Sequence, residues 1–513
     1  MLNGRNEEDR RIYERSARLI FLLALRDVAP GAKVAFEHSL GNGVYLSFAG
    51  IQLNRAILAR IEARMHEITE ANHPIGTRRL SREEAVAYFT AMGRDDTVRL
   101  LRYRPFDYLD IVECDGYGEY FYGAMADSTG EVRHYALRMY YPGAVLLLPT
   151  TDFDREPEAL VDRPGLAHTY REAKRLSGIS GCRYAADLNG IIDRGEMRTL
   201  IRVCEAQQQR AVADAARRIT EKAARIVFVA GPSSSGKTTF ANRLGVELRA
   251  LGRKPVSISL DNYYKNRQDV PIGPDGKLDL ECLESIDVAL FEDHLVSLLD
   301  GMTVEVPRYS FVTKSREPQG EPMSIGPEDI LIVEGIHGLN PELSDSIPAG
   351  YKFLIYVSAL TPLSLDLHNR IRATDARLIR RMVRDLRTRG ASVAETMDMW
   401  DSVRAGEEKY IFPFQERADF MFNTSLAYEL PILKSYAYAL LAAVKPGEAH
   451  YTRARRLVKL LNYFRASEDQ SEIPPTSILR EFIGGCTFYP GDLAQGVSTS
   501  EETPGVQEKE ARR

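Results

Sequence analysis

Short apolar runs alternate with helical stretches in the C-terminal half of the chain. About five consecutive apolar residues are typical of a strand that is buried on both faces of a parallel sheet. The pattern therefore predicts an α/β domain over residues 225–445, in which helices cover a parallel sheet on both sides. The predicted strands are Ile226–Ala230, Val256–Leu260, Ile330–Val333, Phe353–Val357 and Phe420–Phe422.

Residues 1–150 have a different pattern, in which helical and strand signals are mixed. An amphipathic helix is predicted over 11–26, a strand–turn–strand over 34–48 and a second helix over 51–71. Ser81 and Glu84 have the spacing of a capping box that opens a third helix. With further strands predicted at 119–122, 132–139 and 144–148, this half is expected to be an α+β unit with antiparallel strands.

Three segments join or follow these two units. Residues 151–224 are predicted to be a connector with a long helix over 197–224, which could act as a spacer with a solvated charged face. Residues 446–490 are predicted to be a helical extension. Residues 491–513 are polar and lack periodicity, so a disordered tail is expected there.

Composition narrows the class of protein. Hydrophobic residues make up 44% and charged residues 27%, as in globular proteins, and the net charge of -5 provides no overall basic field for nucleic acid. The five cysteines lack the spacing of a disulfide framework or zinc site. The best apolar stretch, Leu19–Leu25, is far shorter than the roughly 20 residues that span a membrane. We therefore expect a soluble cytoplasmic protein that does not bind membranes.

The strongest chemical signal is a phosphate-binding loop. Residues 231–238, GPSSSGKT, match G-x-x-x-x-G-K-[ST] and lie between a predicted strand and a predicted helix. Backbone N–H groups of such a loop bind phosphate oxygens, the lysine reaches the β- and γ-phosphates, and the hydroxyl coordinates Mg²⁺. The motif thus predicts ATP and Mg²⁺ as ligands. The candidate residues are Gly231, Ser233, Ser234, Ser235, Gly236, Lys237, Thr238 and Thr239.

Two carboxylates follow neighbouring predicted strands. Asp261 comes after 256–260, at the end of a strand where α/β sheets bind ligands, and is the candidate proton acceptor for a substrate hydroxyl. Glu334 comes after 330–333, in the position of a Walker B acid. With Thr238 these two residues are the candidate Mg²⁺ ligands. The neighbouring His337 is expected to be a buried structural histidine.

An arginine-rich helix follows later in the sequence. Arg377, Arg380, Arg381 and Arg384 have the i, i+3, i+4, i+7 spacing of one helical face. The spacing alone favours salt bridges at a solvated surface. After a phosphate-binding loop, we interpret the helix instead as a lid, with Arg377 and Arg381 acting in catalysis and Arg380 and Arg384 binding the triphosphate.

These motifs, in this order, resemble the uridine kinase and phosphoribulokinase superfamily over about residues 225–430. The segments that carry the resemblance are GPSSSGKTT, LDNYYK, VPRYSF, IVEGIHGL and DARLIRRMVRDLRTRG. The resemblance implies transfer of the ATP γ-phosphate to a nucleoside 5′-hydroxyl, with Asp261 as the base. It also places Tyr263, Tyr264, Glu281 and Tyr309 around the nucleoside. Lys314 stands where uridine–cytidine kinases typically carry a base-contacting histidine, which leaves the preferred base open.

The N-terminal unit is similar to the second N-terminal domain of threonyl-tRNA synthetases, through Glu37–Tyr45, the helix that includes Met65, and Ser81–Ala85. In those enzymes the domain edits mischarged tRNA with an HxxxH pair. Here His38 is followed by Asn42, so the editing site is expected to be lost. A scaffold or oligomerisation role is favoured, and tRNA binding stays open.

Three hypotheses follow. The main one is an ATP- and Mg²⁺-dependent nucleoside kinase. The second keeps the phosphotransferase but changes the acceptor to another small alcohol, as in phosphoribulokinase or pantothenate kinase. The third is a non-catalytic, ATP-responsive RNA-binding protein. The oligomeric state, including a homo-oligomer, stays open.

Overall fold

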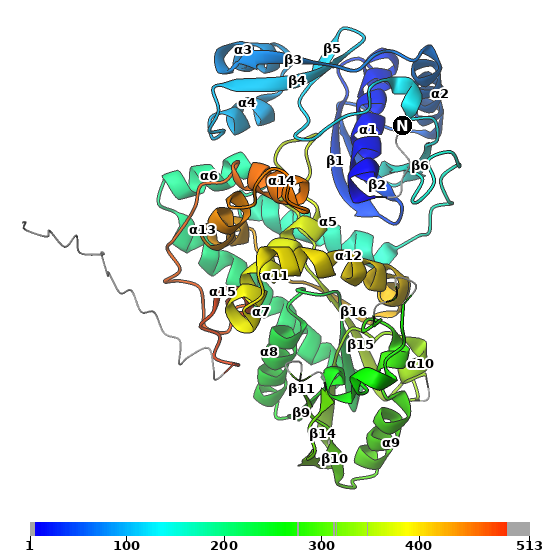
Figure 1. Ribbon diagram of the computed structural model, residues 1–513, viewed down its shortest axis with the longest axis vertical. Helices are drawn as coiled ribbons and strands as arrows, with labels where there is room; N and C mark the ends of the chain where they lie inside the picture. Colours follow the sequence, from blue (N-terminus) through cyan, green and yellow to red (C-terminus); the bar gives the residue numbers. More distant parts are fainter. Residues whose placement is uncertain are drawn as a thin grey trace, which may run out of the picture.

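The computed structural model describes residues 6–273, 276, 278–310, 313, 315–345 and 347–489. The predicted tail at 491–513 and the candidate residue Lys314 lie outside this range. Figure 1 shows two units at opposite ends of the long axis, which we name the N-terminal unit (residues 7–150) and the C-terminal unit (residues 225–445). No helix within the described residues is both long enough and apolar enough to cross a membrane.

The C-terminal unit is built on a five-stranded sheet in which all neighbouring strands are parallel, as the sequence predicted. The strand order is β16-β15-β8-β14-β9, so the first strand along the chain is the central one. The strands are β8 (Ile226–Ala230), β9 (Lys254–Ser259), β14 (Asp329–Glu334), β15 (Lys352–Ser358) and β16 (Phe420–Asn423).

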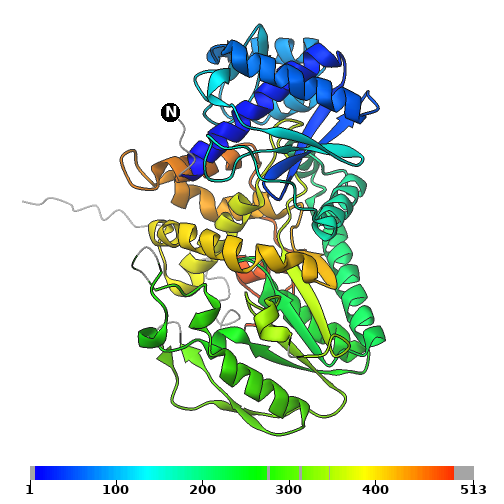
Figure 2. The same cartoon turned by 90° about the vertical axis from the view of Figure 1, so that its right-hand side faces the viewer.

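Both faces of this sheet are buried, because alternate residues of each strand enter different cores. On β8, Val227 and Val229 pack in one core, together with Leu244 of a flanking helix. Phe228 packs in the other core, together with Phe291. The two layers of helices are visible in Figure 2. The helices are α8 (Lys237–Ala250), α9 (Val288–Leu299), α10 (Pro341–Ser344), α11 (Ala373–Arg389), α12 (Val393–Tyr410) and α13 (Glu429–Ala442).

Short strands lie between α9 and β14 and form two small antiparallel pairs. They are β10 (Val304–Val306), β11 (Tyr309–Ser310), β12 (Ser315–Arg316) and β13 (Glu321–Met323).

The N-terminal unit is an α+β arrangement with two antiparallel sheets, ordered β1-β2-β7-β6 and β3-β4-β5. Its strands are β1 (Lys33–Leu40), β2 (Gly43–Ala49), β3 (Gly76–Ser81), β4 (Tyr108–Cys114), β5 (Tyr117–Glu119), β6 (Ala136–Tyr140) and β7 (Gly143–Leu147). Its helices are α1 (Glu7–Val28), α2 (Arg55–Ala71), α3 (Arg82–Ala91) and α4 (Asp95–Leu101).

The predicted hairpin and the predicted capping box are confirmed, the latter with both of its hydrogen bonds at Ser81 and Glu84. The strand expected at 119–122 was wrong, because β5 ends at Glu119. The sequence pattern also missed β3 and β4. All but one residue of β3 are exposed, so the strand has no alternation of apolar and polar residues to detect.

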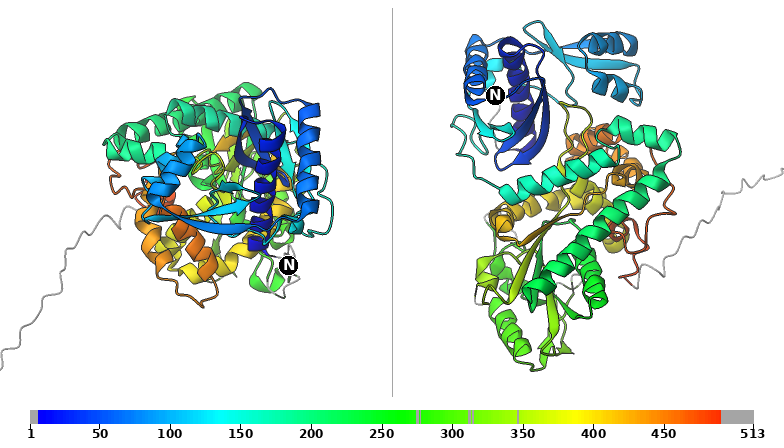
Figure 3. Two further views of the ribbon diagram at one scale, coloured as in Figure 1. Left: turned by 90° about the horizontal axis from the view of Figure 1, so that it is seen from above. Right: turned by 180° about the vertical axis from the view of Figure 1, so that it is seen from behind.

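The connector contains α5 (Pro164–Ile179), α6 (Ala185–Asp193) and α7 (Met197–Lys222). The long helix α7 is not a free spacer, since Val212, Ala216 and Ile219 are buried in the same core as Leu244 and Leu248 of α8. Figure 3 shows α7 running along the C-terminal unit. Most of its charged residues are on the solvated face, as predicted, but Glu205 is buried and accepts a hydrogen bond from Tyr428 at 2.6 Å. The C-terminal helices are α14 (Tyr451–Leu461) and α15 (Arg480–Ile483).

Candidate active site

The phosphate-binding loop connects the central strand β8 to α8. A Cβ atom on Gly231 would lie 1.9 Å from the carbonyl oxygen of Val357, so only glycine fits there. Gly236, with φ +86°, opens α8 from a left-handed backbone conformation that glycine adopts without strain. Within the described residues, the buried hydroxyls of Ser234 and Ser235 have no hydrogen-bond partner. The loop therefore combines a helix N-terminus with unpaired polar groups, as phosphate binding requires.

Two acidic residues lie at the carboxyl ends of β14, which is next to β8, and of β9, which is next to β14. Glu334 ends β14, and its carboxylate accepts hydrogen bonds from Ser259 Oγ at 2.8 Å and Thr238 Oγ1 at 3.4 Å. Asp261 follows β9, and its backbone N–H donates to Ser259 Oγ at 3.3 Å. Because β9, β14 and β8 are adjacent in the sheet, their ends bring Asp261, Glu334 and Lys237 to one edge.

The two carboxylates at this edge are poorly solvated, and burial is the main cause of their pKa shifts. Burial, reinforced by Asp261 and opposed by Lys237, raises the pKa of Glu334 to about 7. Burial also raises the pKa of Asp261, against the influence of Lys237, Arg389 and Arg384. A cation would relieve this repulsion, and carboxylate and hydroxyl oxygens are donors that Mg²⁺ prefers.

The same edge does not form a complete metal cage. Among the described residues, no group of three or more His, Cys, Asp and Glu side chains is arranged to hold a metal ion. Mg²⁺ is commonly held by one or two carboxylates together with phosphate oxygens and water. The donor set of Thr238, Glu334 and Asp261 therefore fits an ion that arrives with a phosphate substrate.

Two of the predicted arginines reach the phosphate-binding loop. Arg377 Nη1 donates to the carbonyl of Ser233 at 3.1 Å, and Arg381 Nη1 donates to Ser233 Oγ at 2.7 Å. Glu407, from α12, binds Arg377 at 2.7 Å and accepts the Ser233 N–H at 3.0 Å. The helix α11 is thus in direct contact with the loop.

The other two predicted arginines lie differently. Arg380 is fully buried, pairs with Glu429, and donates to the carbonyl of Thr424 at 2.9 Å. The expectation that Arg380 contacts phosphate is therefore corrected. Arg380 supports the loop only through Thr424, which donates a hydrogen bond to the Ser235 carbonyl at 2.6 Å. Arg384 pairs with Asp385 at 2.8 Å.

The salt bridges that the spacing favours are present, but they are buried and do not lie at a solvated surface. Helical spacing shows which arginines share a stripe. It does not show the acids that face them, because several of those acids come from distant segments such as α12 and α13.

Of the residues predicted to bind the phosphate-accepting substrate, some lie where that role requires and one does not. Tyr264 is buried and its ring lies 5.4 Å from that of Tyr309. Glu281 packs against Gly406 of α12, where an added Cβ would lie 2.4 Å from the Glu281 Cβ. Tyr263 is fully buried and its hydroxyl contacts His294 Nδ1 at 3.1 Å. Tyr263 is therefore a core residue, which corrects its assignment to the substrate.

Glu281 shares the electrostatic field of the phosphate-binding residues. Burial and then Glu407 raise its pKa to about 7, while Arg381 and Lys237 oppose the shift. Sequence reasoning missed Glu407 and Ser259 as members of the site. Glu407 lies 30 positions from Arg377, so no spacing rule links them. The prediction of a buried His337 is confirmed, and its ring packs against Tyr410.

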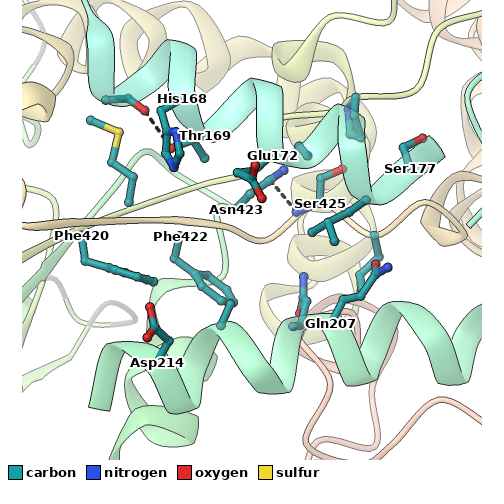
Figure 4. Close-up of a pocket in the computed structure, with 18 of the residues that line it drawn as sticks. His168, Thr169, Glu172, Ser177, Gln207, Asp214, Phe420, Phe422, Asn423 and Ser425 are labelled. Carbon is teal, nitrogen blue, oxygen red and sulfur yellow. Dashed lines mark hydrogen bonds between the residues drawn. The ribbon is translucent and has the colours of Figure 1, made fainter. Parts of the chain in front are cut away.

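A separate cavity of about 600 Å³ lies between α5, α7 and the edge strand β16 (Figure 4). Its charged groups are already paired: Glu416 accepts the N–H groups of Gly165 and Leu166, and Asp214 pairs with Arg217. These pairings distinguish the cavity from the edge around Lys237.

The central strand of a parallel sheet is followed by a phosphate-binding loop, and acids lie at the carboxyl ends of the next two strands on one side, β14 and β9. This arrangement defines a nucleotide-binding P-loop protein. Residues 226–427 match the model of the phosphoribulokinase / uridine kinase family. The chain belongs to this family.

Three relatives illustrate the match. The uridine kinase of Proteus mirabilis is 32% identical over 197 residues, which are 38% of this chain and 84% of the relative. The uridine kinase of Tolumonas auensis is 30% identical, with the same coverage of both chains. The uridine kinase of Halobacterium salinarum is 27% identical over 195 residues, 38% of this chain and 77% of the relative.

These comparisons do not support the expected likeness of residues 1–150 to a synthetase domain, since the family match begins at residue 226. That likeness stays a prediction.

Proposed function

We propose that this protein is an ATP- and Mg²⁺-dependent kinase that transfers the γ-phosphate to the 5′-hydroxyl of a nucleoside. The observation that carries the proposal is the convergence of Lys237, Glu334 and Asp261 at the carboxyl ends of three adjacent parallel strands. All three residues lie inside the segment that matches the kinase family.

The phosphate groups of ATP would be held by the loop from Gly231 to Gly236 and by Lys237. The backbone N–H groups and the N-terminus of α8 supply partial positive charge, and Lys237 supplies a full one. Arg381 lies on Ser233 and brings a second cation to the same loop. These groups stabilise the charge that spreads over the transferred phosphoryl group.

Thr238, Glu334 and Asp261 would hold Mg²⁺, because their hydroxyl and carboxylate oxygens are donors that the ion prefers. When bound, the ion neutralises charge on the β- and γ-phosphate oxygens. Ser259 holds one carboxylate oxygen of Glu334, so the acid is oriented before the substrate arrives. Asp261, on the outer of the three strands, would accept the proton of the attacking hydroxyl.

The acceptor would lie against Glu281, Tyr264 and Tyr309. A carboxylate accepts hydrogen bonds from sugar hydroxyls, and the tyrosine rings offer a surface to a planar base. Arg316 is already engaged with Asp287 at 3.2 Å and with the Tyr264 carbonyl at 2.9 Å. This arrangement favours a neutral acceptor such as a nucleoside over a sugar phosphate.

The test measures ADP formation with Mg·ATP and a panel of uridine, cytidine, adenosine, guanosine, ribulose 5-phosphate and pantothenate. We expect turnover with at least one nucleoside. Asp261→Asn should reduce kcat by about 10²- to 10⁴-fold while ATP binding persists.

Asp269→Asn is the matched control, because Asp269 is exposed and lies in the same loop region. It should keep wild-type turnover. Turnover only with ribulose 5-phosphate or pantothenate would replace the nucleoside by another alcohol, and unchanged kcat in Asp261→Asn would reject the base.

A further inference from the structure

The first turn of α11, the arginine-rich helix of the C-terminal unit, is bound by residues of the N-terminal unit. The helix begins at Ala373, its N-cap residue is Arg372, and no side chain caps it. A positive residue at a helix N-terminus is electrostatically unfavourable. Residues Arg377 and Arg381, which contact the phosphate-binding loop, lie within the first three turns of this helix.

The partner of this turn is α1, at the very start of the N-terminal unit. Arg11 binds Asp375 through two parallel hydrogen bonds, of 3.0 and 2.8 Å. Glu14, one turn further along α1, binds Arg370 at 3.0 and 3.1 Å and also binds Arg372. One face of α1 therefore binds α11 in its first turn, at Asp375, and the residues just before it, Arg370 and Arg372.

These contacts are buried and their charges match. Arg11 is 1% exposed and Asp375 is 2% exposed, so water does not compete for the pair. Paired guanidinium and carboxylate groups in such surroundings fix both the distance and the orientation of the two helices. Arg456 of α14 also binds Asp375, at 3.2 Å, so a third helix joins the cluster.

The geometry leads from this cluster to the candidate active site. Asp375 precedes Arg377 by two residues, a rise of about 3 Å along the helix. A tilt or a register change of the first turn of α11 would therefore move Arg377 and Arg381 relative to Ser233. Displacements of about 1 Å at a catalytic site can cost a factor of about 10² in rate.

We propose that the N-terminal unit is a positioning element for the kinase, in which Arg11 and Glu14 of α1 hold the first turn of α11 so that Arg377 and Arg381 meet the phosphate-binding loop. This assigns a role to a unit that lies outside the family match. The kinetic part of the inference rests on the proposed function, whereas the structural part does not.

The test uses the full chain with Arg11→Ala and Glu14→Gln, and Arg26→Ala as the control. Arg26 lies on the same helix, but its ion pairs are exposed and are made with Asp27 and Asp115, neither of which belongs to α11. Hydrogen exchange is followed in residues 373–389 of α11 and in α8, and kcat/KM for ATP is measured alongside.

We expect faster exchange at the start of α11 in Arg11→Ala and Glu14→Gln, with unchanged exchange in α8, and a fall in kcat/KM of about 10- to 100-fold. Arg26→Ala should stay within about twofold of wild type. Arg11→Lys keeps the charge but not the two-bond geometry and should give an intermediate value.

Wild-type exchange in α11 for both variants would overturn the inference, as would a uniform increase in exchange across α11 and α8. If Arg11→Ala does not fold, the exchange rates of α11 and α8 in Glu14→Gln and Arg11→Lys test the inference in the same way. If the wild-type protein turns over none of the acceptors, the proposed function fails on its own, and the exchange measurements still decide whether α1 holds α11.

Discussion

Buried charge is arranged in opposite ways in the two units. At the contact between the N-terminal unit and the start of α11, acids and bases are matched, as in Arg11 with Asp375 and Glu14 with Arg370. At the carboxyl edge of the C-terminal sheet, burial raises the pKa values of Asp261, Glu334 and Glu281, and the charge of Lys237 opposes all three shifts. At the contact between the two units, the matched charges hold the structure together. At the edge of the sheet, the shifted pKa values of the acids indicate a ligand-binding site.

The buried ion-pair network around Arg94 should be the most sensitive to substitution. Arg94 binds Glu119 at 2.6 Å and Asp96 at 3.0 Å, and Glu119 also contacts His368 at 2.7 Å. Arg94→Leu would leave these acids buried without their main cation, and should lower the free energy of unfolding by about 3–5 kcal/mol. Urea denaturation followed by circular dichroism measures the change.

The control for that substitution is Arg79→Ala, which removes an exposed pair with Asp110 and should cost no more than about 1 kcal/mol. Equal losses in the two variants would show that the buried network is no more important than a surface pair.

Removing a charge at the carboxyl edge of the sheet should raise the free energy of unfolding, whereas Arg94→Leu should lower it. Glu334→Gln removes one of the repelling charges, so at pH 8 it should raise the free energy of unfolding by about 1–2 kcal/mol while abolishing turnover. It should also remove most of the stabilisation by Mg·ATP in a thermal-shift measurement. Glu328→Gln provides the control, because Glu328 is an exposed acid at the opposite end of β14. A Glu334→Gln protein that is less stable than wild type would contradict the raised pKa of Glu334.

The pH dependence should separate the two units. Burial lowers the pKa of His38 to about 3, so the unfolded chain binds this proton more readily than the folded one between pH 6.5 and 3. His38 therefore contributes stability that is present above pH 6.5 and is lost as the pH falls.

The matched variant is His38→Phe, which preserves the stacking on Tyr170. Between pH 7 and 5 it should lose about 1–2 kcal/mol less unfolding free energy than wild type. Identical pH profiles for the two proteins would show that His38 is not buried in its neutral form.

Glu281 should have the reverse sign. Its pKa is raised to about 7 in the folded state, so its contribution to stability is full below its ordinary pKa and is lost as the pH rises through 7. Glu281→Gln should therefore flatten the decline in stability between pH 5 and 8 by about 1 kcal/mol. Chemical denaturation at several pH values tests this, with Glu284→Gln, an exposed acid, as the reference.

The smallest effect is expected at a local motif. Ser81 and Glu84 form a capping box at the start of α3. Ser81→Ala should lower the unfolding free energy by about 1 kcal/mol, because one N–H group of the first turn loses its partner. The same urea titration measures it, and Ser128→Ala, which caps no described helix by its side chain, should have less effect.

The sequence predicted the parts of the molecule that depend on short-range patterns. All five strands of the parallel sheet follow from apolar runs, and the phosphate-binding loop follows from eight consecutive residues. The exposed strand β3 escaped prediction because its partner β4, rather than its own pattern, holds it in place. Tyr263 and Arg380 were assigned to ligands because their positions in the sequence suit such contacts, yet both side chains are fully buried.

What the amino-acid order determined by itself is the repertoire of chemical groups: a loop shaped for phosphate, acids at strand ends, and arginines along one helix. These follow from interactions within a few residues, which a linear pattern records. The tertiary structure alone decided which acid meets which arginine, and that α1 lies against the start of α11 more than 350 positions away. Such pairings depend on how whole elements pack, because the attraction between two charges acts through space and not along the chain.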